Sequence, residues 1–446
     1  MSGGSMGDNL PEHLRGEMAQ PSKAAVESHL HQVPDTSQKL PDDIAEDDYV
    51  GIVHGDDGSD EFVMAPLRTD YKPWHHPIKQ IVRQRQWVES AKRLIESHRS
   101  AERRDKLRYF TLPGADLFDV RVLADSLVEA GTRIEYFGFD SGYEGDGEVA
   151  ANGAKSAYLA AESALRQADR ITEDAVILKD RLEDIAQDES LAATMLDRQG
   201  VFDIINMDAC DHLGYVPKNR KASMFDALEK LLKHQMIAKE PWLLFVTTRA
   251  DVDLLGVPAR KFQTAIGKNI DQHNDAFAKP LSECIDAQLH NLTSAMNGCW
   301  SNQDINFLRL FCIGLGKYLL HFYHAQINLP AGVELVSAYA YKVHRDEPDM
   351  LSLAFRITPK GIQAQAPNTG GAIVVPNVEL QDAVAIVARA KKLWNLDQAI
   401  EDQTDLRNEV VTGTEKLLRS AGFDIPGWQR WLGEHRIRPL DLNVGS

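Results

Sequence analysis

The sequence predicts an α/β protein built around a mainly parallel β-sheet, and two observations support this prediction. Between residues 105 and 257, five short apolar segments alternate with longer segments of helical periodicity. This alternation is typical of parallel strands with helices on both faces of the sheet. Further along, two long alternating segments, 333–343 and 350–357, are joined by a short turn-rich connection. A connection this short requires an antiparallel hairpin, which we expect to close the sheet.

Each predicted element follows from its apolar pattern and from the residues that flank it. Gly131 and Gly200 end two of the helical segments, because glycine readily adopts the left-handed conformation that ends many helices. The predicted strands are 107–112, 134–139, 175–178, 202–207 and 242–247, and the predicted helices between them are 118–129, 156–168, 191–198 and 224–237.

The rest of the chain divides by composition. The first 47 residues are rich in Pro, Ser, Gln and acidic residues, so we expect this segment to be disordered. Apolar residues recur at helical spacing over 78–98, which predicts a long amphipathic helix. The predicted segments are a disordered N-terminal segment (1–47), an N-terminal extension with the basic helix (48–104), a Rossmann-like α/β core (105–257), a helical insertion (258–327), the closing hairpin of the core (328–361) and a helical C-terminal region (362–446).

Composition limits the class of protein. The formal net charge of −17 excludes a protein that coats nucleic acid through a uniformly basic surface, although a local basic patch is still compatible with nucleic-acid contact. No run of about 18 apolar residues occurs and the N-terminus lacks the pattern of a signal peptide, so we expect a cytoplasmic protein without membrane contact. The four cysteines form no CxxC pair, which favours reduced core thiols and predicts no metal site.

Three residues at the ends of predicted strands are candidates for a cofactor site. In an open parallel sheet, ligands bind beyond the carboxyl ends of the strands, where the strand order reverses. Gly114 follows the first strand and would let the backbone approach a ligand closely. Asp140 ends the second strand, where a carboxylate accepts hydrogen bonds from ribose hydroxyls, or alternatively caps a turn. Asp180 follows the third strand and could bind a ligand there, but Asp184 competes for this role and both could face solvent.

The end of the fourth strand carries the candidate catalytic residues. Asn206 and Asp208 alternate onto one face of the strand, because side chains two residues apart point to the same side. We interpret them as catalytic or substrate-binding residues. Arg249, at the end of the fifth strand, supplies the structural alternative, an ion pair with Asp208.

A basic helix supplies a second constellation. Lys79, Arg83 and Arg85 follow the segment Pro-Trp-His-His-Pro at 73–77, and helical spacing predicts that they project from one face. Their functional interpretation is contact with phosphate groups or nucleic acid, because arginine binds phosphate oxygens in a bidentate manner. The alternative is a solvated amphipathic helix packed on the sheet.

Three segments of the sequence resemble the class I S-adenosylmethionine-dependent methyltransferases, which have a Rossmann-like fold. They are TLPGADLFDVR (111–121), NMDAC (206–210) and PWLLFVTTR (241–249). Within this class the chain is similar to bacterial methyltransferase-like proteins carried beside phage-defence genes. The resemblance covers about residues 70–360 and implies five parallel strands closed by an antiparallel hairpin.

The resemblance also implies a cofactor and partners. The cofactor would be S-adenosylmethionine, bound at Gly114, Asp140 and Asp180. The chain keeps only one glycine of the family's GxGxG loop, and Asp208 is followed by Ala-Cys-Asp instead of Pro-Pro and an aromatic residue. Three functions therefore stay open. The chain could be a non-catalytic scaffold or sensor that binds other proteins of an anti-phage defence system, an active methyltransferase on nucleic acid or protein, or a Rossmann-like enzyme that uses another nucleotide.

Overall fold

The computed structural model describes most of the chain beyond its first 66 residues. Residues 66–446 belong to one compact unit. The segment predicted to be disordered, 1–47, lies outside the described residues, as does Cys210. The described residues are 67–98, 103–140, 148–209, 211–325, 330–360 and 378–435.

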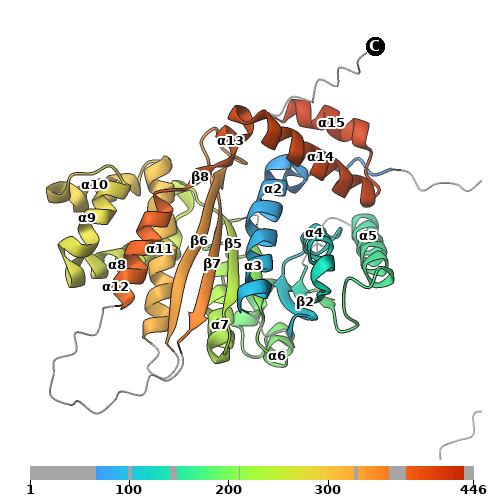
Figure 1. Ribbon diagram of the computed structural model, residues 1–446, viewed down its shortest axis with the longest axis horizontal. Coiled ribbons are helices and arrows are strands. Elements are labelled where there is room, and N and C mark those ends of the chain that lie inside the picture. Colours follow the sequence, from blue (N-terminus) through green and yellow to red (C-terminus); the bar gives the residue numbers. More distant parts are fainter. Residues whose placement is uncertain are drawn as a thin grey trace, which may run out of the picture. The chain divides into compact units, whose positions relative to one another are not determined.

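The strands of the described residues form one mixed sheet. They are β1 (Lys106–Thr111), β2 (Arg133–Phe139), β3 (Val176–Leu178), β4 (Ile204–Asp208), β5 (Trp242–Arg249), β6 (Ala331–Tyr341), β7 (Met350–Pro359) and β8 (Trp394–Asn395). Their order is β3-β2-β1-β4-β5-β7-β6-β8, and Figure 1 shows β5, β7 and β6 beside one another. Strands β1 to β5 are parallel, whereas β7 is antiparallel to both β5 and β6. The predicted α/β class is confirmed, and the hairpin joins the parallel strands through the pairing of β7 with β5.

The strand order reverses beside β1. Strands β2 and β3 lie on one side of it, and β4 and β5 lie on the other. In sheets of this kind, such a reversal separates the connections above the carboxyl ends and opens a crevice between β1 and β4. The short strand β8 was not predicted, because two residues paired with β6 are too few to give a periodic pattern.

Helices cover both faces of the sheet and create two hydrophobic cores. Side chains of β1 alternate between them, with Leu107 and Tyr109 in one core and Phe110 in the other. The first core-forming set is the continuous helix α2 (Pro77–Ile81), η2 (Val82–Val88) and α3 (Glu89–His98), with α4 (Phe118–Leu127), α5 (Glu148–Gln167), α13 (Leu396–Asp402), α14 (Thr404–Ser420) and α15 (Ile425–Glu434). The second set is α6 (Leu191–Asp197), α7 (Met224–His234), α8 (Gly256–His273), α9 (Asp275–Cys284), α10 (Leu292–Cys299), α11 (Ile305–His324) and α12 (Val378–Ala390).

Helix α11 lies in the second core. By length and composition alone it could cross a membrane, but 67% of its most apolar window is buried inside the protein. Such burial is typical of a core helix, and the described part of the chain is consistent with a soluble protein. Cys284, Cys299 and Cys312, which the helical insertion carries, are free thiols.

The helix predicted over 78–98 is present, but its middle, η2, is π-helical. Gln86 in this segment is fully buried and donates hydrogen bonds to Ser337 Oγ (2.9 Å) and to the carbonyl oxygen of Ser352 (3.0 Å). The π-helical turn therefore lies where the helix makes polar contact with the hairpin strands. Segments of this kind occur frequently at functional sites.

Candidate ligand-binding site at the carboxyl edge of the sheet

A cavity of about 1030 Å³ opens at the carboxyl ends of the parallel strands. We call it the switch-point cavity, because it lies where the strand order reverses. Gly114, Asp140 and Asp180, the three predicted cofactor residues, all line it, and so does Asp208. The structure thus brings together four residues that are far apart in the sequence and follow or end four different strands.

The loop between β1 and α4 forms one wall of the cavity. Its Leu117 has φ 51° and ψ 40°, the left-handed conformation that is uncommon for a residue with a side chain. This turn brings the first residues of α4 to the wall. The carboxylate of Asp119 accepts hydrogen bonds from Thr111 Oγ1 and from the Tyr109 hydroxyl (2.9 Å). Burial raises the pKa of Asp119, and the two hydrogen bonds oppose that shift.

Asn206 does not line the cavity, and its predicted catalytic role needs correction. The side chain is fully buried, and its Nδ2 donates a hydrogen bond to the Tyr109 hydroxyl (2.8 Å). Tyr109 in turn donates to Asp119. Asn206 therefore lies behind the wall and positions Asp119 through Tyr109.

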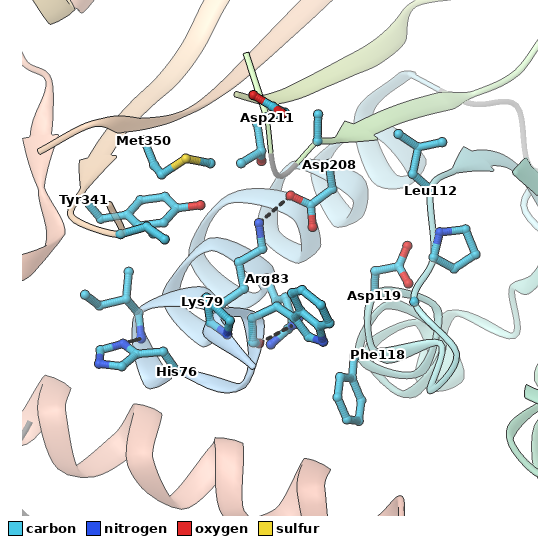
Figure 2. Close-up of a pocket in the computed structure, with 18 of the residues that line it drawn as sticks. His76, Lys79, Arg83, Leu112, Phe118, Asp119, Asp208, Asp211, Tyr341 and Met350 are labelled. Carbon is cyan, nitrogen blue, oxygen red and sulfur yellow. Dashed lines mark hydrogen bonds and ion pairs between the residues drawn. The ribbon is translucent and has the colours of Figure 1, made fainter. Parts of the chain in front are cut away.

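Asp208 pairs with a residue from the N-terminal helix. Figure 2 shows Lys79 Nζ directed at the Asp208 carboxylate, to which it donates a hydrogen bond. Burial disfavours the ammonium group, but the charge and hydrogen bond of Asp208, together with Tyr341, outweigh this effect and raise the pKa of Lys79. The alternative pair of Asp208 with Arg249 is wrong. Arg249 instead donates a hydrogen bond to Asp251 (2.7 Å).

The expectation that three cations project together from the basic helix is also wrong. Lys79 and Arg83 are buried, and both line the switch-point cavity. Arg83 donates a hydrogen bond to the carbonyl oxygen of Trp74 (3.0 Å). Only Arg85 is exposed, and it binds the Glu409 carboxylate at 2.7 and 3.0 Å. The helix therefore does not present these cations side by side to a nucleic-acid backbone, because two of them are buried beside the cavity.

The segment after β3 contributes carboxylates. Asp180 lines the cavity and accepts a hydrogen bond from the backbone N–H of Arg181 (2.9 Å). Its competitor Asp184 does not line the cavity and forms an ion pair with Arg220 (3.1 Å). Glu183, which the sequence analysis missed, is 4% exposed and lines the cavity. Burial raises the pKa of Glu183.

Segments from both ends of the compact unit complete the cavity. Trp74 and His76 contribute from the N-terminal side, and Ile400 and Trp431 contribute from α13 and α15. Figure 1 shows α13, α14 and α15 beside α2. Burial lowers the pKa of His76 to about 4, so this imidazole is neutral at physiological pH. No periodic pattern in the sequence indicates that the C-terminal helices return to this edge.

The β6–β7 hairpin supplies the remaining wall. Tyr341 and Met350 line the cavity at the ends of the two strands, and His344 lines it from the connection between them. His344 was also missed, because a lone histidine in a turn carries no recognisable motif. Among the described residues, no group of three or more His, Cys, Asp or Glu side chains is arranged to hold a metal ion.

Comparison with known proteins gives a family assignment. The model of the PP_RS20740-like family matches residues 68–433, and the chain belongs to this family. The comparison with curated proteins gave no match.

Proposed function

We propose that the chain binds S-adenosylmethionine in the switch-point cavity and transfers its methyl group to an acceptor. The observation that carries this proposal is the convergence of Gly114, Asp140, Asp180 and Asp208 on one cavity. The arrangement of five parallel strands closed by an antiparallel hairpin, which the methyltransferase resemblance implies, supports it. The cavity volume of about 1030 Å³ lies just above the usual range for small-molecule sites, roughly 300–1,000 Å³.

The residues of the cavity fit the chemistry of this cofactor. Asp140 is suited to accept hydrogen bonds from ribose hydroxyls, and Asp180 and Glu183 are suited to accept them from an amino group. A side-chain atom added at Gly114 would meet nothing within 4 Å, so a ligand can approach the backbone here. When bound, the cofactor would supply a methyl group on a positively charged sulfur, and carboxylates around the cavity favour that charge.

Calorimetric titration with S-adenosylmethionine tests cofactor binding. We expect Asp140→Ala to weaken binding by about 1.5–3 kcal/mol, the usual contribution of a hydrogen bond to a charged group. The matched control is Asp174→Ala, which removes an exposed aspartate before the amino end of β3. Absence of binding by the unmodified chain, or equal effects of the two substitutions, would contradict the proposal.

A non-catalytic sensor or scaffold is the second candidate, and the Lys79–Asp208 ion pair favours it. Because Asp208 already pairs with a buried lysine, its carboxylate would be a weaker catalytic base than a carboxylate without such a partner. Such a chain would bind the ligand and signal to partner proteins without consuming it. Production of S-adenosylhomocysteine separates the two candidates, because only the enzyme converts bound cofactor to this product.

A further inference from the structure

The β6–β7 hairpin carries a histidine–aspartate pair at the switch-point cavity. Asp349 is fully buried, and its Oδ1 accepts a hydrogen bond from the backbone N–H of Val343 (2.8 Å). Its Oδ2 lies 2.8 Å from Nδ1 of His344. An ionised carboxylate only accepts hydrogen bonds, so Nδ1 must carry the proton. In the neutral ring the lone pair is then on Nε2, and no described residue forms a hydrogen bond with this atom.

The aspartate is itself held firmly in place. Its backbone carbonyl oxygen accepts a hydrogen bond from the N–H of Ala250 (2.7 Å), and Arg249 Nε lies 3.8 Å from its Oδ2. Arg345, next to His344, donates a hydrogen bond to Asp251 (2.8 Å). A histidine that lines a cavity and is oriented by a fixed carboxylate is the arrangement that general bases use in many enzymes.

The pair lies away from the predicted cofactor residues. In the sheet, β1, β4 and β5 separate the end of β2 from the hairpin strands. Figure 2 shows the same separation, with Tyr341 and Met350 on one side of the Lys79–Asp208 ion pair and Leu112 on the other. A cofactor near β1, β2 and β3 would leave the hairpin side of the cavity to a second molecule.

The charge of the cavity indicates the class of that molecule. Among the residues that the structure describes, ten carboxylate side chains line the cavity, against five from lysine and arginine. This excess attracts cations and repels phosphate groups. The aromatic rings of Tyr215, Tyr341 and Trp431 also line it, and aromatic faces bind ammonium groups.

We propose that His344 accepts a proton from the methyl acceptor and that this acceptor is an amine. The inference rests on the proposed methyltransferase function. An ammonium group gives one N–H proton to Nε2 of His344. The freed nitrogen lone pair then forms a bond to the methyl carbon, and the carbon–sulfur bond breaks with its electron pair left on sulfur. His344 later returns the proton to solvent.

The first experiment measures the ring and its ligand without turnover. Nitrogen NMR of histidine-labelled protein should show His344 as the Nδ1–H tautomer, with its signals assigned through His344→Asn. Calorimetry should show binding of spermidine, a polyamine, but not of a short phosphate-rich oligonucleotide. An Nε2–H tautomer overturns the assignment of His344, and failure to bind spermidine overturns the assignment of an amine.

The second experiment measures transfer of labelled methyl groups to spermidine, a lysine-rich peptide, transfer RNA and duplex DNA. We expect label in the amine acceptors alone, and a fall of about 10²–10⁴-fold in His344→Asn, the usual contribution of a general base. Asparagine keeps a donor towards Asp349, so the hairpin should stay folded. Added imidazole should restore part of the activity of His344→Ala, which a purely structural role would not allow. His290→Asn, at an exposed site, is the matched control.

The possible failures are distinguishable. If S-adenosylmethionine does not bind, the proposed function fails, and the spermidine and NMR measurements still decide the amine and tautomer assignments. If the cofactor binds but only nucleic acid is methylated, or nothing is, the amine assignment is overturned. If His344→Asn transfers methyl groups as fast as the unmodified protein, His344 is not the proton acceptor.

Discussion

Lys79 and Asp208 place opposite charges at a wall of the cavity where little water reaches them. The Lys79 side chain is 8% exposed and that of Asp208 is 22% exposed. Removing one partner of a buried ion pair leaves the other charge uncompensated, at a cost of about 3–5 kcal/mol. We therefore expect Asp208→Asn to lower the free energy of unfolding by roughly this amount in urea titrations.

The double variant Lys79→Met with Asp208→Asn provides the control. It removes both charges together, so we expect it to recover most of the lost stability. Arg85→Ala breaks an exposed pair with Glu409 and should cost less than about 1 kcal/mol. If the stability losses of Lys79→Met and Asp208→Asn alone add up to the loss in the double variant, the ion pair does not couple the two residues.

His75 gives a prediction about acid stability. Burial, together with the nearby cations Arg83, Arg68 and Lys72, lowers the pKa of His75 to about 3. The unfolded chain therefore binds a proton below about pH 6.5 that the folded protein excludes, so stability falls as pH decreases from about 6.5 towards 3. At about 1.4 kcal/mol per pH unit, the loss from this residue between pH 6.5 and 5 is about 2 kcal/mol.

Urea denaturation of His75→Phe tests the origin of this loss. Phenylalanine fills the space between Phe118 and Phe423. The centres of these two rings lie 5.5 and 4.8 Å from the centre of the His75 imidazole. We expect the variant to lose less stability between pH 7 and 5 than the unmodified protein, whatever its stability at pH 7. An identical pH dependence would show that His75 does not contribute.

At the scale of elements, β2 approaches the end of β1 so closely that only glycine fits at one position. A side-chain atom added at Gly138 would clash with the carbonyl oxygen of Thr111, which belongs to the backbone and cannot rotate away. We expect Gly138→Ala to separate the two strands, lower the melting temperature and weaken ligand binding beside Gly114. Thermal denaturation and calorimetry measure the two effects.

Gly267 in α8 is the matched control for this substitution. A side-chain atom added there would meet nothing within 4 Å, and alanine favours helix by about 1 kcal/mol over glycine. Gly267→Ala should therefore leave the melting temperature unchanged or raise it. If both alanine variants behave alike, close approach at Gly138 is not limiting.

The elements themselves could be predicted because each has a local pattern. Alternation and apolar runs gave β5, predicted over 242–247 and observed over Trp242–Arg249. The direction in which a basic side chain points is harder to predict, because helical spacing predicts a face of the helix but not what packs against that face. Lys79 and Arg83 were assigned to solvent, yet the carboxylate of Asp208 and the carbonyl oxygen of Trp74 draw them inwards. Tertiary packing brings these partners to the helix, and the local sequence pattern of the helix does not predict that packing.

The candidate site likewise contains some residues that could be predicted from the sequence and others that could not. Asp140 and Asp180 could be predicted from their position after a strand, since parallel strands end at one edge. His344 could not, because its orientation depends on Asp349, and the cavity it faces is completed by helices from the far end of the chain. The negative charge of the cavity wall could not be predicted either, because its carboxylates come from segments that only the fold brings together.

At the scale of the whole molecule, two distant segments join to close the compact unit. The N–H of Arg68 donates to the carbonyl oxygen of Gly422 (2.9 Å), and the N–H of Asp424 donates to that of Arg68 (2.9 Å). The guanidinium group of Arg68 lies 4.2 Å from the centre of the Phe423 ring. Nearby, Trp428 Nε1 donates to the carbonyl oxygen of His75 (3.1 Å). These contacts hold the C-terminal helices against α2 and over the cavity.

This closure sets the boundary of the folding unit, and two truncations test it. A chain of residues 66–446 keeps every contact just described, so we expect it to retain the melting temperature and ligand affinity of the full chain. A chain of residues 77–446 lacks Arg68 and His75 and exposes Trp428, which is fully buried. Burial of a large apolar side chain contributes about 1.5–3 kcal/mol, so this chain should melt several degrees lower and bind ligand more weakly. Thermal denaturation followed by calorimetry measures both quantities. Equal stability of the two truncated chains would show that residues 66–76 do not close the unit, and a loss already present in 66–446 would move the boundary towards the N-terminus.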